Sequence, residues 1–259
     1  MKKLSTAAFL AILTLLFCVG VLAQAPEAKK ADQTRTSKSS APTVREILDR
    51  YVTALGGREA ILKVKTRYSR GTVELIPMNL KGSFETIAAA EASSFSKISI
   101  GGIGDMLEGS DGKSGWSINP ITGSRDKSGP ELAQAKLIND FYRDIRLEKL
   151  FPKIELKGTE KVGERAVYVL TAAADGLPAE TWYFDKETGL MVKSEFVAIS
   201  PEGNTAMTVV YEDYRNVDGV MTAFRIRTQT PQFELVLNAT EVKNGVPIDE
   251  AVFKRPKSN

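Results

Sequence analysis

A helix is predicted at residues 44–55, because apolar side chains recur there with the period of an α-helix. They fall at i, i+3, i+4, i+7, i+8 and i+11, and they are Val44, Ile47, Leu48, Tyr51, Val52 and Leu55. Thr43 and Glu46 have the spacing of a capping box, which marks the first turn. Gly56 and Gly57 then end the helix, and residues 58–64 are expected to form a second, short helix.

From Thr66 onward the apolar period changes to two, which is typical of β-strands. Residues 224–229 and 233–238 follow this alternation, whereas 166–171 carry apolar side chains on both faces. Turn signals separate such runs, and they are Asp111-Gly112, Asp175-Gly176, Asp218-Gly219, Asn244-Gly245 and the segment 185–189. Strands at this spacing predict an antiparallel meander.

One further helix interrupts the strands. It is expected to begin at Ser128, because Pro130 then lies in the first helical turn. Its broad apolar face continues until about Leu150, and the face consists of Leu132, Ala135, Leu137, Ile138, Phe141, Tyr142 and Ile145.

The predicted fold is therefore α+β and mainly antiparallel β, with about eleven strands and two or three helices in one domain of residues 43–259. A twisted sheet of that length curls, and as an unclosed β-barrel it needs the helices packed on its concave face. Loose packing would leave an apolar cavity, the usual site for a ligand. Tight packing would give a solid core, and the sequence allows both.

The composition removes most catalytic chemistry. The 259 residues include no His and one Cys. Nucleophile pairs that use His, zinc or haem sites that use His, and an internal disulfide are therefore excluded. We predict no catalytic residue, no metal site and no cofactor.

Residues 1–23 have the layout of a secretory signal peptide. Lys2 and Lys3 precede an apolar run at 7–17, and small residues follow before a cut after Ala23 or Ala25. The run is short for a membrane span. Cys18 would leave with the signal, so we expect a cysteine-free protein in the periplasm or secreted.

Residues 24–42 lack aromatic and large aliphatic side chains, so they are predicted to be a flexible linker. The formal net charge of +3 belongs to this linker and the signal, which leaves residues 43–259 near −1. Nucleic acid is therefore not an expected partner.

Four segments of the chain carry a family resemblance. They are DGKSGWSINP at 111–120, WYFDKETGL at 182–190, YEDYRNVDGV at 211–220 and VPIDEAVF at 246–253. In this order, behind a signal peptide and a leading helix, they resemble the periplasmic lipoprotein carrier superfamily, the LolA/LolB-like proteins, with RseB-like envelope sensors as relatives. The resemblance covers roughly residues 44–256.

The resemblance implies an unclosed barrel of about eleven strands with helices as a lid over an apolar cavity. In the carriers that cavity accepts the acyl chains of lipoproteins. The insert at 123–149 and the near-neutral charge do not identify a carrier subtype. No residue that hands over a lipoprotein can be carried across position by position.

The candidate ligand-binding residues are the large apolar side chains of these segments and of the second helical region. They are Trp116, Trp182 and Phe184 on strands, and Leu137, Ile138, Phe141 and Tyr142 on the helix. Trp182 and Phe184 share one face of a strand, and Tyr183 lies on the other. The alternative is that all of them are ordinary core.

Three functions are compatible with these observations. The first is a carrier, a monomer without enzymatic activity, that binds a lipid or a lipoprotein acyl chain in the envelope. The second is a structural, interaction or sensor module without a cavity, whose partner is an envelope protein. The third is an enzyme that uses carboxylates alone, which would need two acids about 5 to 10 Å apart in a polar groove.

Overall fold

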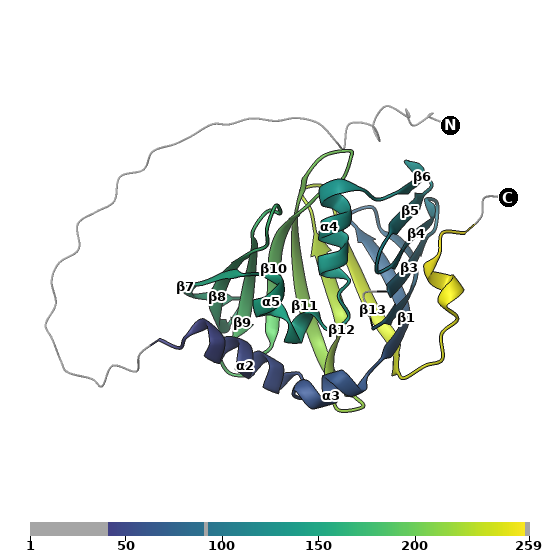
Figure 1. The fold of residues 1–259 in the computed structure, drawn as a ribbon. Coiled ribbons are helices and arrows are strands. Elements are labelled where there is room, and N and C mark those ends of the chain that lie inside the picture. The colour runs from purple at the N-terminus through teal and green to yellow at the C-terminus, as the bar shows by residue number, and fades with distance from the viewer. Residues whose placement is uncertain (1–40, 91–92, 257–259) are drawn as a thin grey trace, which may run out of the picture. The chain divides into compact units, whose positions relative to one another are not determined.

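The structure is a computed structural model, and it describes residues 41–90 and 93–256 (Figure 1). The predicted signal peptide and all of the predicted linker before residue 41 lie outside the described residues.

The described strands form one antiparallel sheet of thirteen strands, in the order β6-β5-β4-β3-β2-β1-β13-β12-β11-β10-β9-β8-β7. Their bounds are β1 (Thr66–Ile76), β2 (Leu80–Ala89), β3 (Ser93–Ile100), β4 (Gly104–Asp111), β5 (Gly115–Asn119), β6 (Gly123–Asp126), β7 (Lys153–Val162), β8 (Arg165–Ala173), β9 (Glu180–Asp185), β10 (Met191–Ala198), β11 (Thr205–Val217), β12 (Val220–Gln229) and β13 (Glu234–Asn244).

Two meanders, β1–β6 and β7–β13, meet where β1 pairs with β13. The outer strands β6 and β7 lie at opposite ends of the order, so the sheet is not closed. The predicted α+β class and unclosed barrel are confirmed. The predicted number of about eleven strands is too low, because a strand as short as β6, with four residues, shows no readable alternation.

The helices in the described residues are α2 (Val44–Ala54), α3 (Arg58–Lys63), α4 (Gly129–Ile138) and α5 (Leu147–Leu150), with 3-10 turns η2 (Arg143–Ile145) and η3 (Glu250–Phe253). The predicted capping box is present. The Glu46 amide donates to Thr43 Oγ1 at 3.2 Å, and the Thr43 amide donates to Glu46 Oε2 at 2.7 Å.

The prediction of one helix from Ser128 to about Leu150 is wrong. Helix α4 ends at Ile138, with Asn139 as its C-cap. The Asp140 carboxylate then accepts a hydrogen bond from the Tyr142 amide at 2.8 Å. This local bond competes with helical hydrogen bonding, so the apolar residues beyond Asn139 enter η2 and α5 instead.

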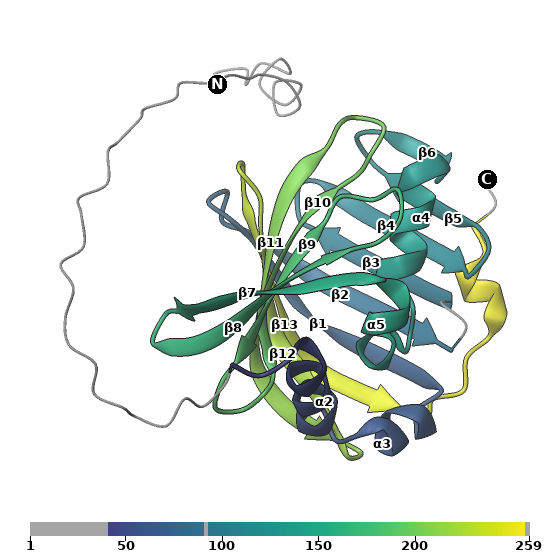
Figure 2. The ribbon, with the colours of Figure 1, turned by 60° about the vertical axis from the view of Figure 1, so that its left-hand side comes forward.

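The predicted turn at 185–189 is confirmed, whereas the predicted hairpin turn at Asn244-Gly245 is wrong. At 185–189 the Asp185 carboxylate accepts hydrogen bonds from the Glu187 and Thr188 amides, and Gly189 has a φ of 78°, as predicted. Asn244-Gly245 joins no pair of strands. It ends β13, and the following segment 246–253 leads to η3 on the outer side of the sheet (Figure 2).

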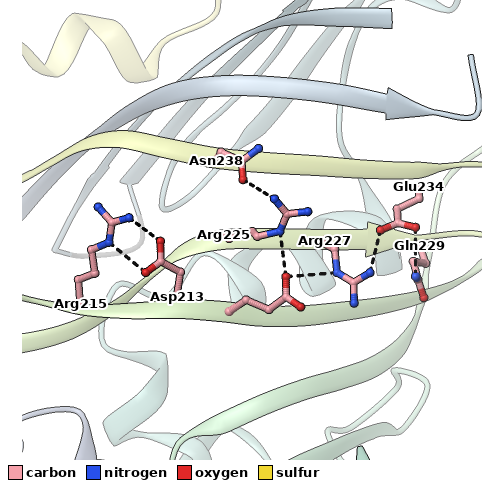
Figure 3. Close-up of polar contacts among 8 residues, drawn as sticks. Asp213, Arg215, Arg225, Arg227, Gln229, Glu234 and Asn238 are labelled. Carbon is pink, nitrogen blue, oxygen red and sulfur yellow. Dashed lines mark hydrogen bonds and ion pairs between the residues drawn. The ribbon is translucent and has the colours of Figure 1, made fainter. Parts of the chain in front are cut away.

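The convex face of the sheet is polar around β12, whereas at β8 and β9 it carries a buried apolar cluster that includes Val169 and Tyr183. On β12, Arg225 donates to Glu212 at 3.0 Å and to Asn238 at 2.9 Å, and Arg227 donates to Glu234 at 3.2 Å (Figure 3). Each guanidinium therefore has an acidic neighbour on an adjacent strand. The charges cancel locally, which makes this a solvated outer face and directs attention to the concave face.

Two glycines allow the sheet to bend sharply. A Cβ built on Gly82 would lie 1.8 Å from the Ser99 carbonyl oxygen, and one built on Gly71 would lie 2.0 Å from that of Asn238. Only glycine lets neighbouring backbones approach this closely. These close approaches join β2 to β3 and β1 to β13, and they help the sheet to curl into a barrel wall.

Replacing Gly82 by alanine is expected to lower the free energy of unfolding by at least about 1 kcal/mol, because the added methyl group meets a neighbouring backbone. Urea denaturation measures the change. The matched control is Gly101→Ala, where the nearest atom lies 3.6 Å from the built Cβ. Equal stability of the two variants would contradict this account of the bend.

Candidate functional site

One face of the sheet carries the helices, and the strand register identifies its residues. Trp182 pairs with Ser194, Ser194 with Val209, Val209 with Thr228, Thr228 with Leu235 and Leu235 with Leu75. Directly paired residues share a face. Leu75 of β1 therefore faces the same side as Trp182 of β9, which is the concave side that α2, α4 and α5 cover (Figures 1 and 2).

The half of this face near β7–β10 is filled. Trp182 is 0% exposed and Phe184 1%. The Trp182 ring meets the rings of Phe151 and Phe184 edge-on, with centroids 4.8 and 6.5 Å apart. Residues of α2, α3, η2 and α5 complete this cluster. This half is a solid core.

A buried ion pair lies within that core. Arg143 donates to Glu180 Oε2 at 2.5 Å, and Trp182 Nε1 donates to the same oxygen at 2.7 Å. The Arg143 guanidinium also lies over the Phe151 ring, 5.2 Å from its centroid. Burial opposes the charge of Arg143, but the Glu180 carboxylate outweighs burial and raises the pKa of the guanidinium.

A second buried contact ties α2 to η2. The Tyr51 hydroxyl donates to Asp144 Oδ1 at 2.8 Å. Burial, and then the Asp144 charge, raise the pKa of Tyr51 well above its usual value. Tyr51 therefore stays a neutral hydrogen-bond donor, and these polar groups hold the helices to the sheet.

The other half of the concave face, formed by β1–β4 and β13, is apolar and less completely covered. We call its residues the apolar zone, and they are Val73, Leu75, Phe84, Ile98, Ile100, Met106, Leu235 and Leu237. Four of them, Val73, Leu75, Phe84 and Ile100, are buried, and the other four, Ile98, Met106, Leu235 and Leu237, are partly buried. Side chains of this kind could contact an apolar ligand.

Helix α4 lies over the concave face, yet polar contacts hold it there. Its one buried side chain is Gln134. The Gln134 amide donates to the Val197 carbonyl oxygen at 2.8 Å and accepts from the Ile199 amide at 2.9 Å. Near its N-terminus, Glu131 accepts both guanidinium bonds of Arg125 at 2.7 and 2.9 Å. Leu137 of the same helix packs at the margin of the filled core, so both polar and apolar contacts attach α4.

Replacing Gln134 by alanine is expected to speed hydrogen exchange at the Ile199 amide by about tenfold, because that amide loses its acceptor. Site-resolved hydrogen exchange measures the rate. The control is the Lys193 amide in β10, the strand that ends just before Ile199, and this amide should keep its rate. An unchanged rate at Ile199 would contradict the assigned role of Gln134.

The structure brings some of the predicted site residues together. Trp182, Phe184 and Tyr142 belong to the filled core, and Leu137 and Phe141 pack at its margin. Ile138, at the end of α4, is 43% exposed.

Trp116 is not among them. Trp116 pairs with Gly109. The neighbouring pair, Ser110 and Gly115, lies on the opposite face, where Gly115 is next to Leu132 of α4. Trp116 is 3% exposed, and its Nε1 donates to the Phe253 carbonyl oxygen at 2.8 Å. The C-terminal segment 246–253 therefore covers Trp116 on the convex side.

Sequence reasoning missed the apolar zone and Gln134. The residues of the apolar zone follow the same alternation as any half-buried strand, so nothing in the pattern distinguishes them. Gln134 interrupts an apolar helix face, and that interruption was the available signal.

Within 41–90 and 93–256, no group of three or more Asp, Glu, His and Cys side chains could hold a metal ion. Among the described helices, none is both long enough and apolar enough to cross a bilayer.

Comparison with known proteins gives structural matches only. The sequence matches no family model and no curated protein. A LolA superfamily protein from Nitrosomonas europaea aligns over 83% of this chain and 99% of its own, with 16% identity and a TM-score of 0.54. A DUF1329 family protein from Desulfovibrio piger aligns over 82% and 97%, with 15% identity and a TM-score of 0.55.

A protein domain from Vibrio parahaemolyticus, named for outer membrane lipoprotein sorting, aligns over 80% of this chain and 94% of its own, with 14% identity and a TM-score of 0.50. At these identities the likeness concerns the fold. The chain thus shares its fold with these proteins, among them a LolA superfamily protein, and the resemblance found in its sequence motifs is confirmed at the level of the fold.

Proposed function

We propose that this protein is a non-enzymatic carrier or binding protein of the cell envelope, which holds a hydrophobic ligand such as the acyl chain of a lipid or lipoprotein. The observation that carries the proposal is the apolar zone. Partly buried apolar side chains line the concave face there, and the helix over that face is attached through Gln134 and Glu131.

The energetics favour an apolar ligand at this position. Removing apolar surface from water contributes about 25 cal/mol per Å². An acyl chain on the apolar zone would bury both its own surface and the exposed parts of side chains such as Met106 and Leu237. Selectivity would come from the shape of the face, and release from movement of α4.

Two observations support a location in the cell envelope. Residues 1–23 have the layout of a signal peptide, and two of the similar structures are named for LolA or for lipoprotein sorting. We place the protein in the periplasm, as a monomer with the single domain 43–259 joined to a flexible linker. Its partners would be lipid, a lipoprotein acyl chain, or the envelope protein that delivers one.

The test is to purify the mature protein from a lipid-containing host, extract it, and analyse the extract by mass spectrometry. We expect a bound lipid, and we expect fatty acid to displace a fluorescent fatty-acid probe. The absence of both results would contradict the proposal. It would favour the interaction module, for which the solid core around Trp182 provides a rigid scaffold.

A further inference from the structure

A small pocket of mixed lining lies beside the apolar zone, between α4 and strands β2–β5. Its volume is about 180 Å³. Its lining includes the polar residues Thr86, Ser94, Ser96, Glu108, Ser110, Lys127 and Asn139 and the apolar residues Ile87, Ala88, Phe95 and Ala135. Whole-ligand sites usually measure roughly 300 to 1,000 Å³. The pocket is therefore large enough for part of a ligand only.

The pocket continues the face that carries the apolar zone. Phe84 pairs with Ile98, and Ile98 with Met106. Next on the same face come Thr86, Ser96 and Glu108, which again pair in register. Two residues along a strand span about 7 Å. On β2, β3 and β4 the face thus changes from apolar to polar between these two rows of paired residues.

This boundary matches the shape of an amphiphile. An acyl chain against Phe84, Ile98 and Met106 would bring its polar end to the level of Thr86 and Ser96. A purely apolar ligand would leave the polar residues without a role. The arrangement fits a ligand that has both parts.

The charges of the pocket cancel. Lys127 Nζ donates to Glu108 Oε2 at 3.0 Å, and the Lys127 side chain is 12% exposed, whereas the Glu108 side chain is 57% exposed. An anionic head group would have to approach the Glu108 carboxylate, and a cationic one the Lys127 ammonium. Desolvating such a charge without a free counter-charge is unfavourable.

The hydroxyl groups of the pocket favour an uncharged head group. Thr86, Ser94 and Ser96 line the pocket, and each carries a hydroxyl group. A hydroxyl both donates and accepts. An uncharged head group that also carries hydroxyls could satisfy them without disturbing the ion pair.

We infer that this pocket binds the head group of an uncharged, hydroxyl-bearing amphiphile, of the glycerol or sugar class. The inference rests on the proposed function, since it assigns the polar end of the same ligand. The acyl chain lies on the apolar zone, and Thr86 and Ser96 hydrogen-bond the head group beneath α4.

The test compares three ligands with the same dodecyl-length chain: monododecanoylglycerol, dodecanoate and dodecyltrimethylammonium. Their displacement of an apolar fluorescent probe from the full mature protein is measured. We expect the glycerol ester to bind about tenfold more tightly than either charged ligand, the effect of one to two net hydrogen bonds.

The variants Thr86→Val and Ser96→Ala, combined, remove two hydroxyls with little change of shape. We expect them to abolish the preference for the glycerol ester and to leave the affinity for the probe unchanged. The matched control, Thr72→Val on the exposed convex face, should keep the preference.

The outcomes separate the two proposals. If the wild-type protein binds the three ligands equally, or if the double variant keeps the preference, the head-group assignment is wrong and the proposed function stands. If the wild-type protein binds neither the probe nor any of the ligands, the proposed function itself is wrong.

Discussion

Replacing Trp182 by alanine is expected to lower the free energy of unfolding by about 3 to 5 kcal/mol, the usual cost of truncating a buried aromatic residue. Trp182 is fully buried, and its ring contacts Phe151 and Phe184. Its loss would leave a cavity at the centre of the filled core. Urea denaturation followed by far-UV circular dichroism measures the change.

A milder substitution provides the control for Trp182. Trp182→Phe keeps a ring in the cavity and removes the hydrogen bond from Nε1 to Glu180. Its cost should be clearly smaller than that of Trp182→Ala. If the two variants were equally stable, or if both matched the wild type, the filled core would not be the main source of stability.

Replacing Glu180 by glutamine is expected to cost about 3 kcal/mol, because it leaves the Arg143 guanidinium buried without a counter-charge. The side chains of Arg143 and Glu180 are 17% and 8% exposed, so water cannot replace the lost partner. The control is Glu155→Gln at the exposed pair with Lys157, which should not change stability measurably.

A double variant tests the electrostatic origin of that cost. When both partners of a buried ion pair are replaced by apolar residues, the loss is usually small. Arg143→Met combined with Glu180→Leu should therefore be more stable than Glu180→Gln alone. A double variant that is less stable than the single one would show that packing, and not the unpaired charge, dominates.

The parts of the fold that depend on neighbouring residues could be predicted from the sequence. The capping box at Thr43 and the turn at Asp185 each need contacts within three residues. The alternation that places Trp182 and Phe184 on one face is equally local. For these elements, local hydrogen bonding and side-chain period are sufficient.

The parts that depend on distant contacts could not be predicted. Trp116 is buried on the convex face because Phe253, 137 residues later, covers it there. The helix after Ser128 ends at Ile138, where a local bond to Asp140 and packing against the sheet outweigh the apolar pattern. The pattern of a strand also does not show whether helices cover its face. Helices cover the face at Trp182 but not at Met106.

The central claim is that an acyl chain binds the concave face, and adjacent residues of β4 test it most directly. Met106 belongs to the apolar zone, and Leu107 points to the opposite face. In the variants Met106→Trp and Leu107→Trp, quenching of the introduced indole by a brominated fatty acid reports contact with the chain. The wild-type protein gives the background from Trp116 and Trp182. We predict strong quenching for Met106→Trp and little for Leu107→Trp. Equal quenching of both, or stronger quenching for Leu107→Trp, would contradict the account.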